Sequence, residues 1–135
     1  MKIKLIRTFA EEFSLSSLNE DLERDEISFT TFTAASSFSP SRFFIGFNLT
    51  LRIEEQNQFA VKYLAEFESD SEATPEVLEN NSFVQVNAPA IAYPFLRAFI
   101  ATIMLNAGYE PPMLPAVNFQ ALYQKRVSSK NKDNT

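Results

Sequence analysis

One apolar stretch constrains the fold of this chain more than any other feature. Residues 86–109, VNAPAIAYPFLRAFIATIMLNAGY, contain a single charged residue, Arg97, although the whole chain has a net charge of −5. Pro94 suits the first turn of a helix, and Gly108 suits the position just after a helix ends. We therefore predict a helix from Pro94 to Ala107, which would be a membrane span, a core helix, or a helix buried on two sides.

The predicted helix is too short to cross a membrane. At about 1.5 Å per residue it is about 21 Å long, whereas the hydrocarbon core of a bilayer is about 30 Å thick. Arg97 near its middle would add an insertion cost of about 3 kcal/mol. We therefore expect no stable membrane insertion.

Apolar side chains surround the axis of this helix, and Thr102 and Asn106 do not make a broad polar face. A helix that is apolar nearly all round is buried on more than one side. A sheet of the same chain can cover one side, and we expect a second subunit to cover the other. The apolar residues around the axis are Phe95, Leu96, Phe99, Ile100, Ile103, Met104 and Leu105.

Two segments before the helix predict a β-hairpin. Residues 43–53 place six apolar side chains on one face by strict alternation, and residues 58–68 alternate in the same way. A period of two with one apolar face is typical of a half-buried antiparallel strand. Residues 55–57, Glu-Gln-Asn, supply the turn between the two strands.

Two more strands are expected in the N-terminal part. Residues 3–15 keep an apolar phase that Arg7 and Glu11 interrupt. Residues 26–33 form the other strand, and its apolar phase slips between Phe29 and Phe32. We therefore predict a β-bulge near residues 30–31.

The C-terminal part predicts short helical elements. A helical turn is expected at 75–78, and Asn118 can N-cap a helix from Phe119 to about Val127. The predicted fold is α+β, with a four-stranded antiparallel sheet whose one face carries the long apolar helix and the C-terminal helix. We assign residues 1–126 to a single domain and residues 127–135 to a flexible polar tail.

The composition excludes several kinds of chemistry. The chain has no Cys, no His and only two Gly, so it lacks the thiolate and imidazole ligands of zinc sites, and no Gly-rich phosphate loop can be written. We expect no metal and no cofactor. We also expect no nucleic-acid partner, because the basic residues cluster only near the C-terminus. The absence of Cys suits a reducing cytoplasm, and we expect a cytoplasmic protein.

The segment from Val86 to Gln124 resembles the C-terminal half of the SecB family of bacterial protein-export chaperones. The matching features are Pro89, the Tyr93-Pro94 pair, Arg97, the Pro-Ala-Val-Asn-Phe box at 115–119 and the following Ala121-Leu122. The resemblance implies a homotetramer built as a dimer of dimers, with the long helices between the dimers. It implies an ATP-independent holdase, not an enzyme, that binds unfolded precursor proteins and delivers them to the export ATPase SecA.

The sequence departs from the family pattern in two places. The family's crossover between the first two strands commonly carries Trp and Pro, and its C-terminal tail is usually acidic. Here the crossover is SSLNEDLERDE and the tail is Lys-rich. SecB-like proteins also serve toxin–antitoxin systems, where they protect an antitoxin, and this is the alternative function. Which of the two partners applies, which clients bind, and whether the protein is a tetramer or a dimer stay open.

The resemblance also implies candidate site residues. The SecA-facing surface would consist of Glu12, Leu64 and Glu66, which the alternation places on the outer, water-facing side of the sheet. Candidates for the client-binding groove are Leu18, Leu22, Phe95 and Phe99. Candidates for the oligomer interface are Phe99, Ile100, Ile103 and Met104.

Some of these candidate residues also fit an ordinary structural role, and two other classes of function are possible for the chain. Phe95 and Phe99 also fit a plain core or interface role, and Glu12 and Glu66 fit ordinary solvated charges. We expect Arg97 to form a structural ion pair, since a cation on an apolar helix needs a partner. A carboxylate enzyme and a small-molecule-binding domain are the rivals, and a single deep pocket of roughly 300 to 1,000 Å³ would favour them over a shallow groove.

Overall fold

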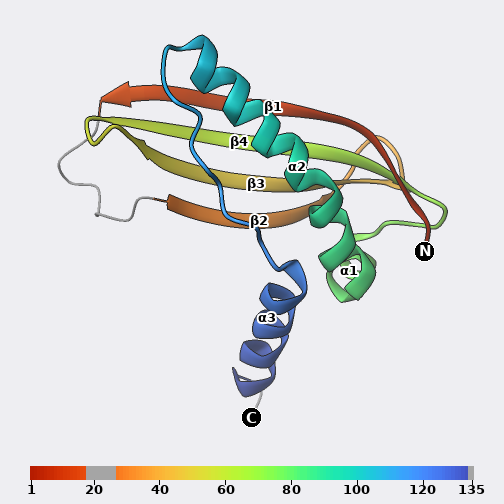
Figure 1. Ribbon diagram of the computed structural model, residues 1–135. Helices are drawn as coiled ribbons and strands as arrows, with labels where there is room; N and C mark the ends of the chain where they lie inside the picture. Colours follow the sequence, from red (N-terminus) through yellow and green to blue (C-terminus); the bar gives the residue numbers. More distant parts are fainter. Residues whose placement is uncertain (18–26, 134–135) are drawn as a thin grey trace.

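The structure is a computed structural model that describes residues 1–17 and 27–133. In this part the chain forms β1 (Ile3–Ser17), β2 (Ile27–Ala35), β3 (Arg42–Ile53), β4 (Asn57–Ser69), α1 (Pro75–Asn80), α2 (Ser82–Asn106) and α3 (Phe119–Asp133). The strands form one antiparallel sheet in the order β1-β4-β3-β2, and α2 crosses it obliquely (Figure 1). The predicted α+β class is confirmed.

The predicted hairpin forms the centre of the sheet. Its apolar face turns toward α2 and is almost completely shielded from water, as the stacked rings of Phe43 and Phe67 illustrate, with centroids 5.4 Å apart. Glu54 and Glu55 make the turn with positive φ angles of 50° and 64°. The buried residues of this face are Phe43, Ile45, Phe47, Leu49, Leu51 and Ile53 of β3 and Phe59, Val61, Tyr63, Ala65 and Phe67 of β4.

The two outer strands differ in regularity. In β1 the pairing with β4 shifts between Leu5 and Arg7 and again between Ala10 and Glu12, where the apolar phase of the sequence is interrupted. In β2 the pairing with β3 is continuous from Ile27 to Ala35, so the predicted bulge is wrong. The out-of-phase Phe32 instead lies on the face of the sheet opposite to α2.

The long helix begins earlier than Pro94. Asn81 caps it, since its side-chain oxygen accepts a hydrogen bond from the Val84 backbone N–H at 3.1 Å. Pro89 and Pro94 both lie inside the helix. Each proline removes one backbone hydrogen bond, but packing on the sheet supplies most of the stability of such a helix.

Because α2 is longer than the predicted helix, its length does not exclude a membrane span. Its 25 residues make a helix that is long and apolar enough to cross a bilayer by length and composition alone. However, one face of α2 packs against the sheet at every fourth residue. These buried residues are Val84, Ala88, Ala92, Leu96, Ile100 and Met104.

The end of α2 and the start of α3 are capped as the sequence predicts. Gly108 follows the last helical turn with a φ of 91°, and the Tyr109 N–H donates to the Met104 carbonyl at 2.8 Å. This is the Schellman arrangement that favours glycine. Asn118 accepts a hydrogen bond from the Ala121 N–H at 3.0 Å and begins α3. The helix then continues beyond Val127 into the segment predicted to be a tail.

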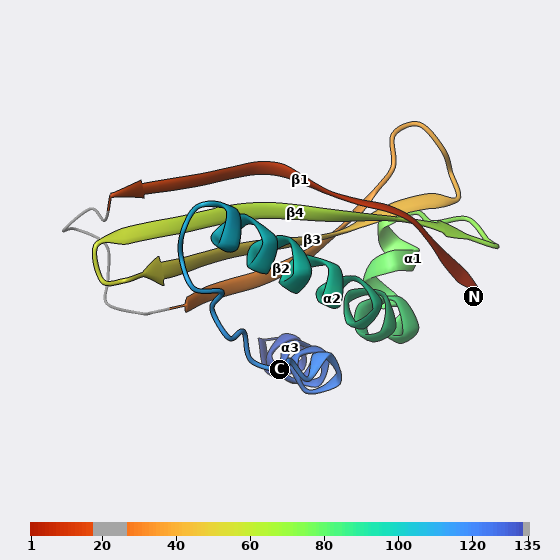
Figure 2. The ribbon, with the colours of Figure 1, turned by 45° about the horizontal axis from the view of Figure 1, so that its top comes forward.

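The two larger helices leave one face of the sheet uncovered. Both α2 and α3 lie on the same side of the sheet, and α3 points away from it beyond β2 (Figures 1 and 2). We call the opposite side the outer face. The segment between the helices runs beside α2, over the strands, toward β2, where α3 begins (Figure 1).

Candidate functional site

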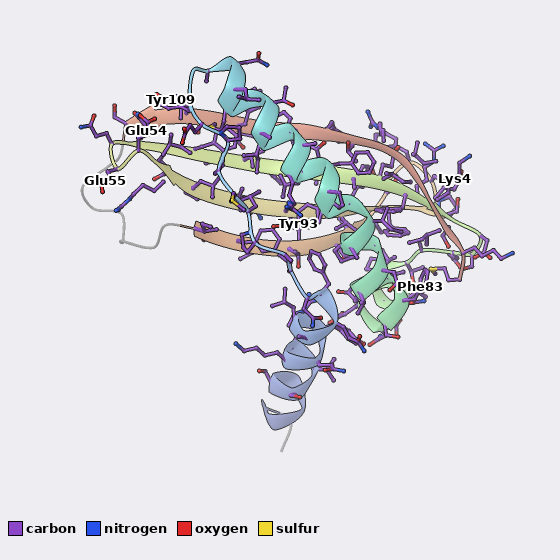
Figure 3. The ribbon with its side chains drawn as sticks, in the orientation of Figure 1. Lys4, Glu54, Glu55, Phe83, Tyr93 and Tyr109 are labelled. Carbon is purple, nitrogen blue, oxygen red and sulfur yellow. The ribbon has the colours of Figure 1, made fainter. Side chains whose placement is uncertain are left out.

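Tyr93 joins α2, the sheet and the C-terminal segment. Its hydroxyl donates to the Pro115 carbonyl at 2.7 Å, and its ring packs edge-on against Phe29 and Phe119 at centroid distances of 5.8 and 5.7 Å (Figure 3). Burial raises the pKa of Tyr93 above its ordinary value, and the charge of Arg97 opposes that shift. Tyr93 therefore fixes where the Pro-rich segment and α3 leave the core.

Arg97 makes a different contact from the predicted ion pair. Its guanidinium carbon lies 5.8 Å from the centre of the Tyr93 ring, in a cation–π contact. Arg97 also lines a cavity of about 420 Å³ between α2 and the Pro-rich segment, with Pro111 and Met113 on the other side. Met113 is almost completely exposed.

Of the four predicted client-binding residues, the structure describes two, and these two differ in burial. Phe99 is half-buried and packs against Phe13 and Tyr63, with ring centroids 5.5 and 5.3 Å apart. Phe95 is 45% exposed and points away from the core. Leu18 and Leu22 lie outside the described residues.

Two of the predicted interface residues are core residues of the chain itself. Ile100 and Met104 are 1% and 0% exposed, because the sheet covers them. They are therefore not on the surface of the subunit, where another subunit could contact them. Phe99 and Ile103 are half-buried against the same core, so they are only partly available to another subunit.

Other large apolar side chains of α2 are exposed. Phe83, Ile91 and Phe95 precede members of the buried row and lie on one flank of it, and Leu105 follows Met104 on the opposite flank. We call the exposed surface of α2 that they border the open face of α2, and it is the side that we expect a second subunit to cover. Its large apolar members are Phe83, Ile91, Phe95 and Leu105, with exposed fractions of 40%, 42%, 45% and 62%.

The outer face of the sheet carries an apolar row across all four described strands. Register pairs Phe9 with Leu64, Leu64 with Gly46, and Gly46 with Phe32. A Cβ atom on Gly46 would collide with the Phe32 ring, so Phe32 covers that glycine. Leu64, one of the predicted SecA-facing residues, is half-buried in the middle of this outer row.

Glu66 lies on the outer face, but it is buried, whereas we expected it to face water. It is 6% exposed, and a single carboxylate oxygen lies 3.4 Å from Arg7 Nε and 3.5 Å from Arg42 Nη1. The two arginines come from β1 and β3, on either side of β4. The acidic charge expected at this position is therefore compensated by two neighbouring cations.

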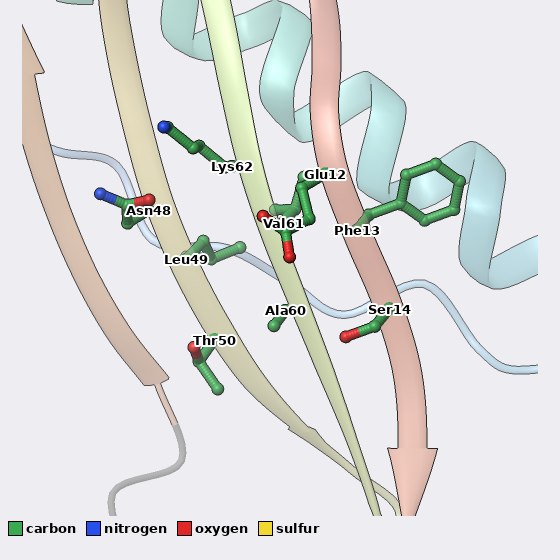
Figure 4. A pocket seen from close by; sticks show the side chains of 9 residues that line it. All are labelled: Glu12, Phe13, Ser14, Asn48, Leu49, Thr50, Ala60, Val61 and Lys62. Atoms are coloured by element: carbon green, nitrogen blue, oxygen red, sulfur yellow. The ribbon is translucent and has the colours of Figure 1, made fainter.

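Glu12, the remaining predicted SecA-facing residue, is exposed on the outer face. It lies at a shallow cavity of about 240 Å³ over β1, β4 and β3, opposite Lys62 (Figure 4). Lys62 forms an ion pair of 3.2 Å with Glu11. Glu12 and Glu66 therefore lie in different electrostatic surroundings, although both occupy the same face.

A further groove lies between β2 and α3, and our sequence analysis missed it. We call it the β2–α3 groove. It has a volume of about 590 Å³ and is open to solvent. The signal was present in Lys125 and Arg126, but these were attributed to a basic region near the tail. The lining residues are Phe29, Thr30, Thr31, Leu122, Lys125, Arg126 and Ser129.

No group of three or more acidic side chains in the described ranges, 1–17 and 27–133, is close enough to hold a metal ion. The surfaces found are apolar stripes and shallow grooves with charged borders. Such surfaces bind by non-directional burial of apolar area, at about 25 cal/mol per Å².

Comparison with known proteins agrees with this architecture. Residues 26–130 match the family model described as "Preprotein translocase subunit SecB". The chain is 31% identical over 121 residues to a protein-export protein SecB of Rickettsia felis, a match that covers 84% of this chain and 76% of that protein. It is also 33% identical over 81 residues to the SecB protein of Ralstonia nicotianae.

The curated relatives are longer than the segment they share with this chain. The Ralstonia match covers 46% of that protein, and a match to the SecB protein of Anaplasma phagocytophilum covers 43% of its length. In these matches the chain therefore spans less than half of the relative.

Solved structures share the fold at low sequence identity. A SecB-like chaperone of Mycobacterium tuberculosis, in complex with a ChAD peptide from an antitoxin, superposes with a TM-score of 0.63 at 14% identity over 85% of this chain and 87% of that one. A protein of unknown function from Streptococcus agalactiae gives 0.58 at 10% identity, over 86% and 98%. Because the family model matches residues 26–130, most of this chain, and the Rickettsia felis protein is matched over 76% of its length, this chain belongs to the SecB family.

Proposed function

We propose that the protein is an ATP-independent holdase that binds unfolded precursor proteins in the cytoplasm and delivers them to SecA. The observation that carries the proposal is the open face of α2, which leaves Phe95 and Leu105 exposed on a chain of the SecB family. A holdase needs apolar surface that tolerates many sequences, and burial of such surface is non-directional. The proposal involves no chemical step and no cofactor.

The proposal includes a homotetramer arranged as a dimer of dimers. Exposed large apolar side chains that gather on one helix are the kind of feature that marks an interaction surface in soluble proteins. The open face of α2 replaces Ile100 and Met104 as the proposed contact between dimers. Phe99 and Ile103 belong to its border. Phe95 and, outside the described residues, Leu18 and Leu22 remain proposed client contacts.

Delivery to SecA is the part of the proposal that the local charges support least. Glu66 is covered by Arg7 and Arg42, so the proposed SecA-facing surface would rest on Glu12 and the half-buried Leu64. The alternative is a chaperone that protects an antitoxin. It is favoured by the solved structure of a SecB-like chaperone with an antitoxin peptide, which shares this fold.

A small-molecule-binding function is the remote alternative. The β2–α3 groove reaches the size range of ligand pockets, about 300 to 1,000 Å³, with about 590 Å³. It is open along the edge of the sheet, however, and such a shape suits a chain segment better than a small molecule that must be enclosed.

The holdase function can be tested by light scattering. A chemically denatured, slow-folding precursor protein is diluted into buffer with and without this protein, in the absence of ATP. We expect delayed refolding and suppressed aggregation at stoichiometric amounts. Unchanged refolding and aggregation across several clients would contradict the proposal. Titration of SecA into the protein then separates export delivery, where binding is expected, from the antitoxin alternative.

A further inference from the structure

We propose that the cavity between α2 and the Pro-rich segment binds an apolar chain that ends in a single carboxylate. We call it the Arg97 cavity. The inference goes beyond the proposed holdase function and does not depend on it. Three features of the cavity support it: an apolar lining, walls that are held in place, and one cation that no described side chain neutralises.

The lining of the Arg97 cavity is almost entirely apolar. Its volume of about 420 Å³ falls within the range of about 300 to 1,000 Å³ that is typical of ligand pockets. Ala98 and Ala101 lie on the same side of α2 by their spacing, and their small side chains leave the space open. On the other wall Leu114 is 7% exposed, whereas Met113 is 97% exposed and free to close over a bound molecule.

The Pro-rich wall of the cavity is fastened at both ends by tyrosines of known position (Figure 3). At its start the Asn57 side-chain amide donates to the Tyr109 hydroxyl at 3.3 Å. At its end the Tyr93 hydroxyl donates to the Pro115 carbonyl at 2.7 Å. The two prolines at 111–112 restrict the backbone between these points. A wall that is already fixed loses little conformational entropy when a ligand binds.

Arg97 supplies the charge of the cavity. It is the single charged residue of α2 and, among the described residues, the single charged one in the lining. Its guanidinium lies over the Tyr93 ring, and none of the described carboxylates forms an ion pair with it. The contact with the ring uses the face of the guanidinium plane and leaves the N–H groups at its edge free to donate. A guanidinium edge binds a carboxylate through two parallel hydrogen bonds.

These features together select one ligand chemistry. One cation matches one negative charge, and the apolar lining matches hydrocarbon, whose burial contributes about 25 cal/mol per Å². A phosphate monoester would bring more charge and more hydrogen-bond acceptors than this lining satisfies. An apolar chain with one carboxylate occurs both in a fatty acid and at the C-terminus of an apolar peptide, and the test distinguishes these two sources.

The test measures the binding of decanoate to the full chain by isothermal titration calorimetry, at concentrations below those at which decanoate forms micelles. Decanol, which has the same hydrocarbon chain and no charge, is the matched ligand. Arg97→Met removes the cation and keeps a similar side-chain length. Because hydrogen bonds to a charged group are the stronger ones, this variant should bind decanoate at least about tenfold more weakly. Its affinity for decanol should change by less than about threefold.

Two further variants locate the site. Arg126→Met removes one guanidinium from the exposed part of α3, outside the cavity, and should bind decanoate like the wild type. Ala98→Leu fills the cavity and should abolish the binding of both ligands. Circular dichroism verifies that all variants are folded. Equal affinity of the wild type and Arg97→Met for decanoate would overturn the inference, as would an equal loss in Arg126→Met.

A pair of peptides identifies the source of the carboxylate. The two share one short apolar sequence, with a free C-terminal carboxylate in one and an amide in the other. Tighter Arg97-dependent binding of decanoate than of the free peptide would support a fatty acid, and the reverse order, with weaker binding of the amidated peptide, would support a polypeptide terminus. Both outcomes agree with the proposed chemistry.

The remaining outcomes separate this inference from the others. If a second copy of the chain covered the cavity, the wild type would not bind decanoate, and Arg97→Met would lower the mass of the assembly in light scattering. That result would overturn the inference. Suppression of client aggregation without binding of decanoate or of the free peptide would remove this inference alone, whereas absence of protection for every client would remove the proposed function.

Discussion

The ring of Phe32 lies over Gly46 on the outer face of the sheet, in the space that a side chain at position 46 would occupy. Cross-strand pairing places the two residues directly opposite each other on β2 and β3. This contact explains why the apolar phase of β2 breaks without a bulge: Phe29 packs toward α2, and Phe32 turns outward to cover a glycine.

Gly46→Val should therefore destabilise the fold. The new side chain requires the Phe32 ring to move from its position, and overpacking of this kind costs about 1–3 kcal/mol. Urea denaturation monitored by circular dichroism measures the loss in the free energy of unfolding.

A double variant provides the control for this prediction. In a Phe32→Ala background the space over Gly46 is vacant, so the same substitution should cost at least about 1 kcal/mol less. An equal cost in both backgrounds would mean that the contact between the two residues does not limit the choice at position 46.

Glu66 should contribute to stability through its two arginines. Glu66→Gln leaves Arg7 and Arg42 side by side without a carboxylate between them, and we expect a loss of about 1–3 kcal/mol. The control is Glu68→Gln, two residues along the same strand and exposed, for which we expect a change within about 0.5 kcal/mol. Thermal unfolding at neutral pH compares the two variants, and similar losses would show that the arginines do not depend on Glu66.

This role of Glu66 also changes how a partner surface can be tested. Glu66→Lys would place a third cation beside two arginines and would disturb the fold together with any interface. Leu64→Ser combined with Glu12→Lys avoids the problem, since Glu12 is exposed and Leu64 is half-buried. Calorimetric titration with SecA should show an affinity reduced by about tenfold or more, that is by at least about 1.4 kcal/mol. An unchanged affinity would remove both residues from the proposed surface.

The sequence predicts the sheet better than the helix because the two follow different periods. Strict alternation from Phe43 to Ile53 leaves no other choice of buried face, and all six residues are buried. The start of α2 was missed because Pro94 is a strong signal for a first helical turn. Tertiary packing overrides that local preference here, and the true cap is Asn81.

The candidate sites were predicted less well because contacts across strands are not visible in a linear pattern. Alternation correctly places Glu66 opposite to Tyr63 and Ala65, but it cannot show that Arg7, far away in the sequence, covers it. The same holds for Ile100 and Met104. Helical spacing shows that α2 is apolar all round, but only the packed structure shows which side the sheet takes.

The open face of α2 should carry the subunit contact. Leu105 is 62% exposed, so Leu105→Asp should leave the subunit folded while lowering the mass of the assembly measured by light scattering, because the charge would have to be buried unpaired in the interface. Met104 is completely buried in the subunit, so Met104→Asp should unfold the chain itself. A wild-type protein that is monomeric at micromolar concentration would contradict the tetramer.

Tyr93 should make the fold sensitive to alkaline pH. Burial raises the pKa of its hydroxyl above the ordinary value of 10.0, so the folded state holds the proton more tightly than the unfolded state does. The stabilisation is fully present below pH 10 and is lost as the pH rises through the folded-state pKa, since there the unfolded state has already released the proton. Tyr93→Phe removes the hydrogen bond to the Pro115 carbonyl and should cost about 1 kcal/mol at neutral pH. In the alkaline range, unfolding free energies from urea titrations should fall less steeply for this variant than for the wild type. Tyr123→Phe, a change in α3 outside this contact, is the control for the removal of a tyrosine hydroxyl. Parallel slopes for the wild type and Tyr93→Phe would show that the Tyr93 proton is not linked to folding.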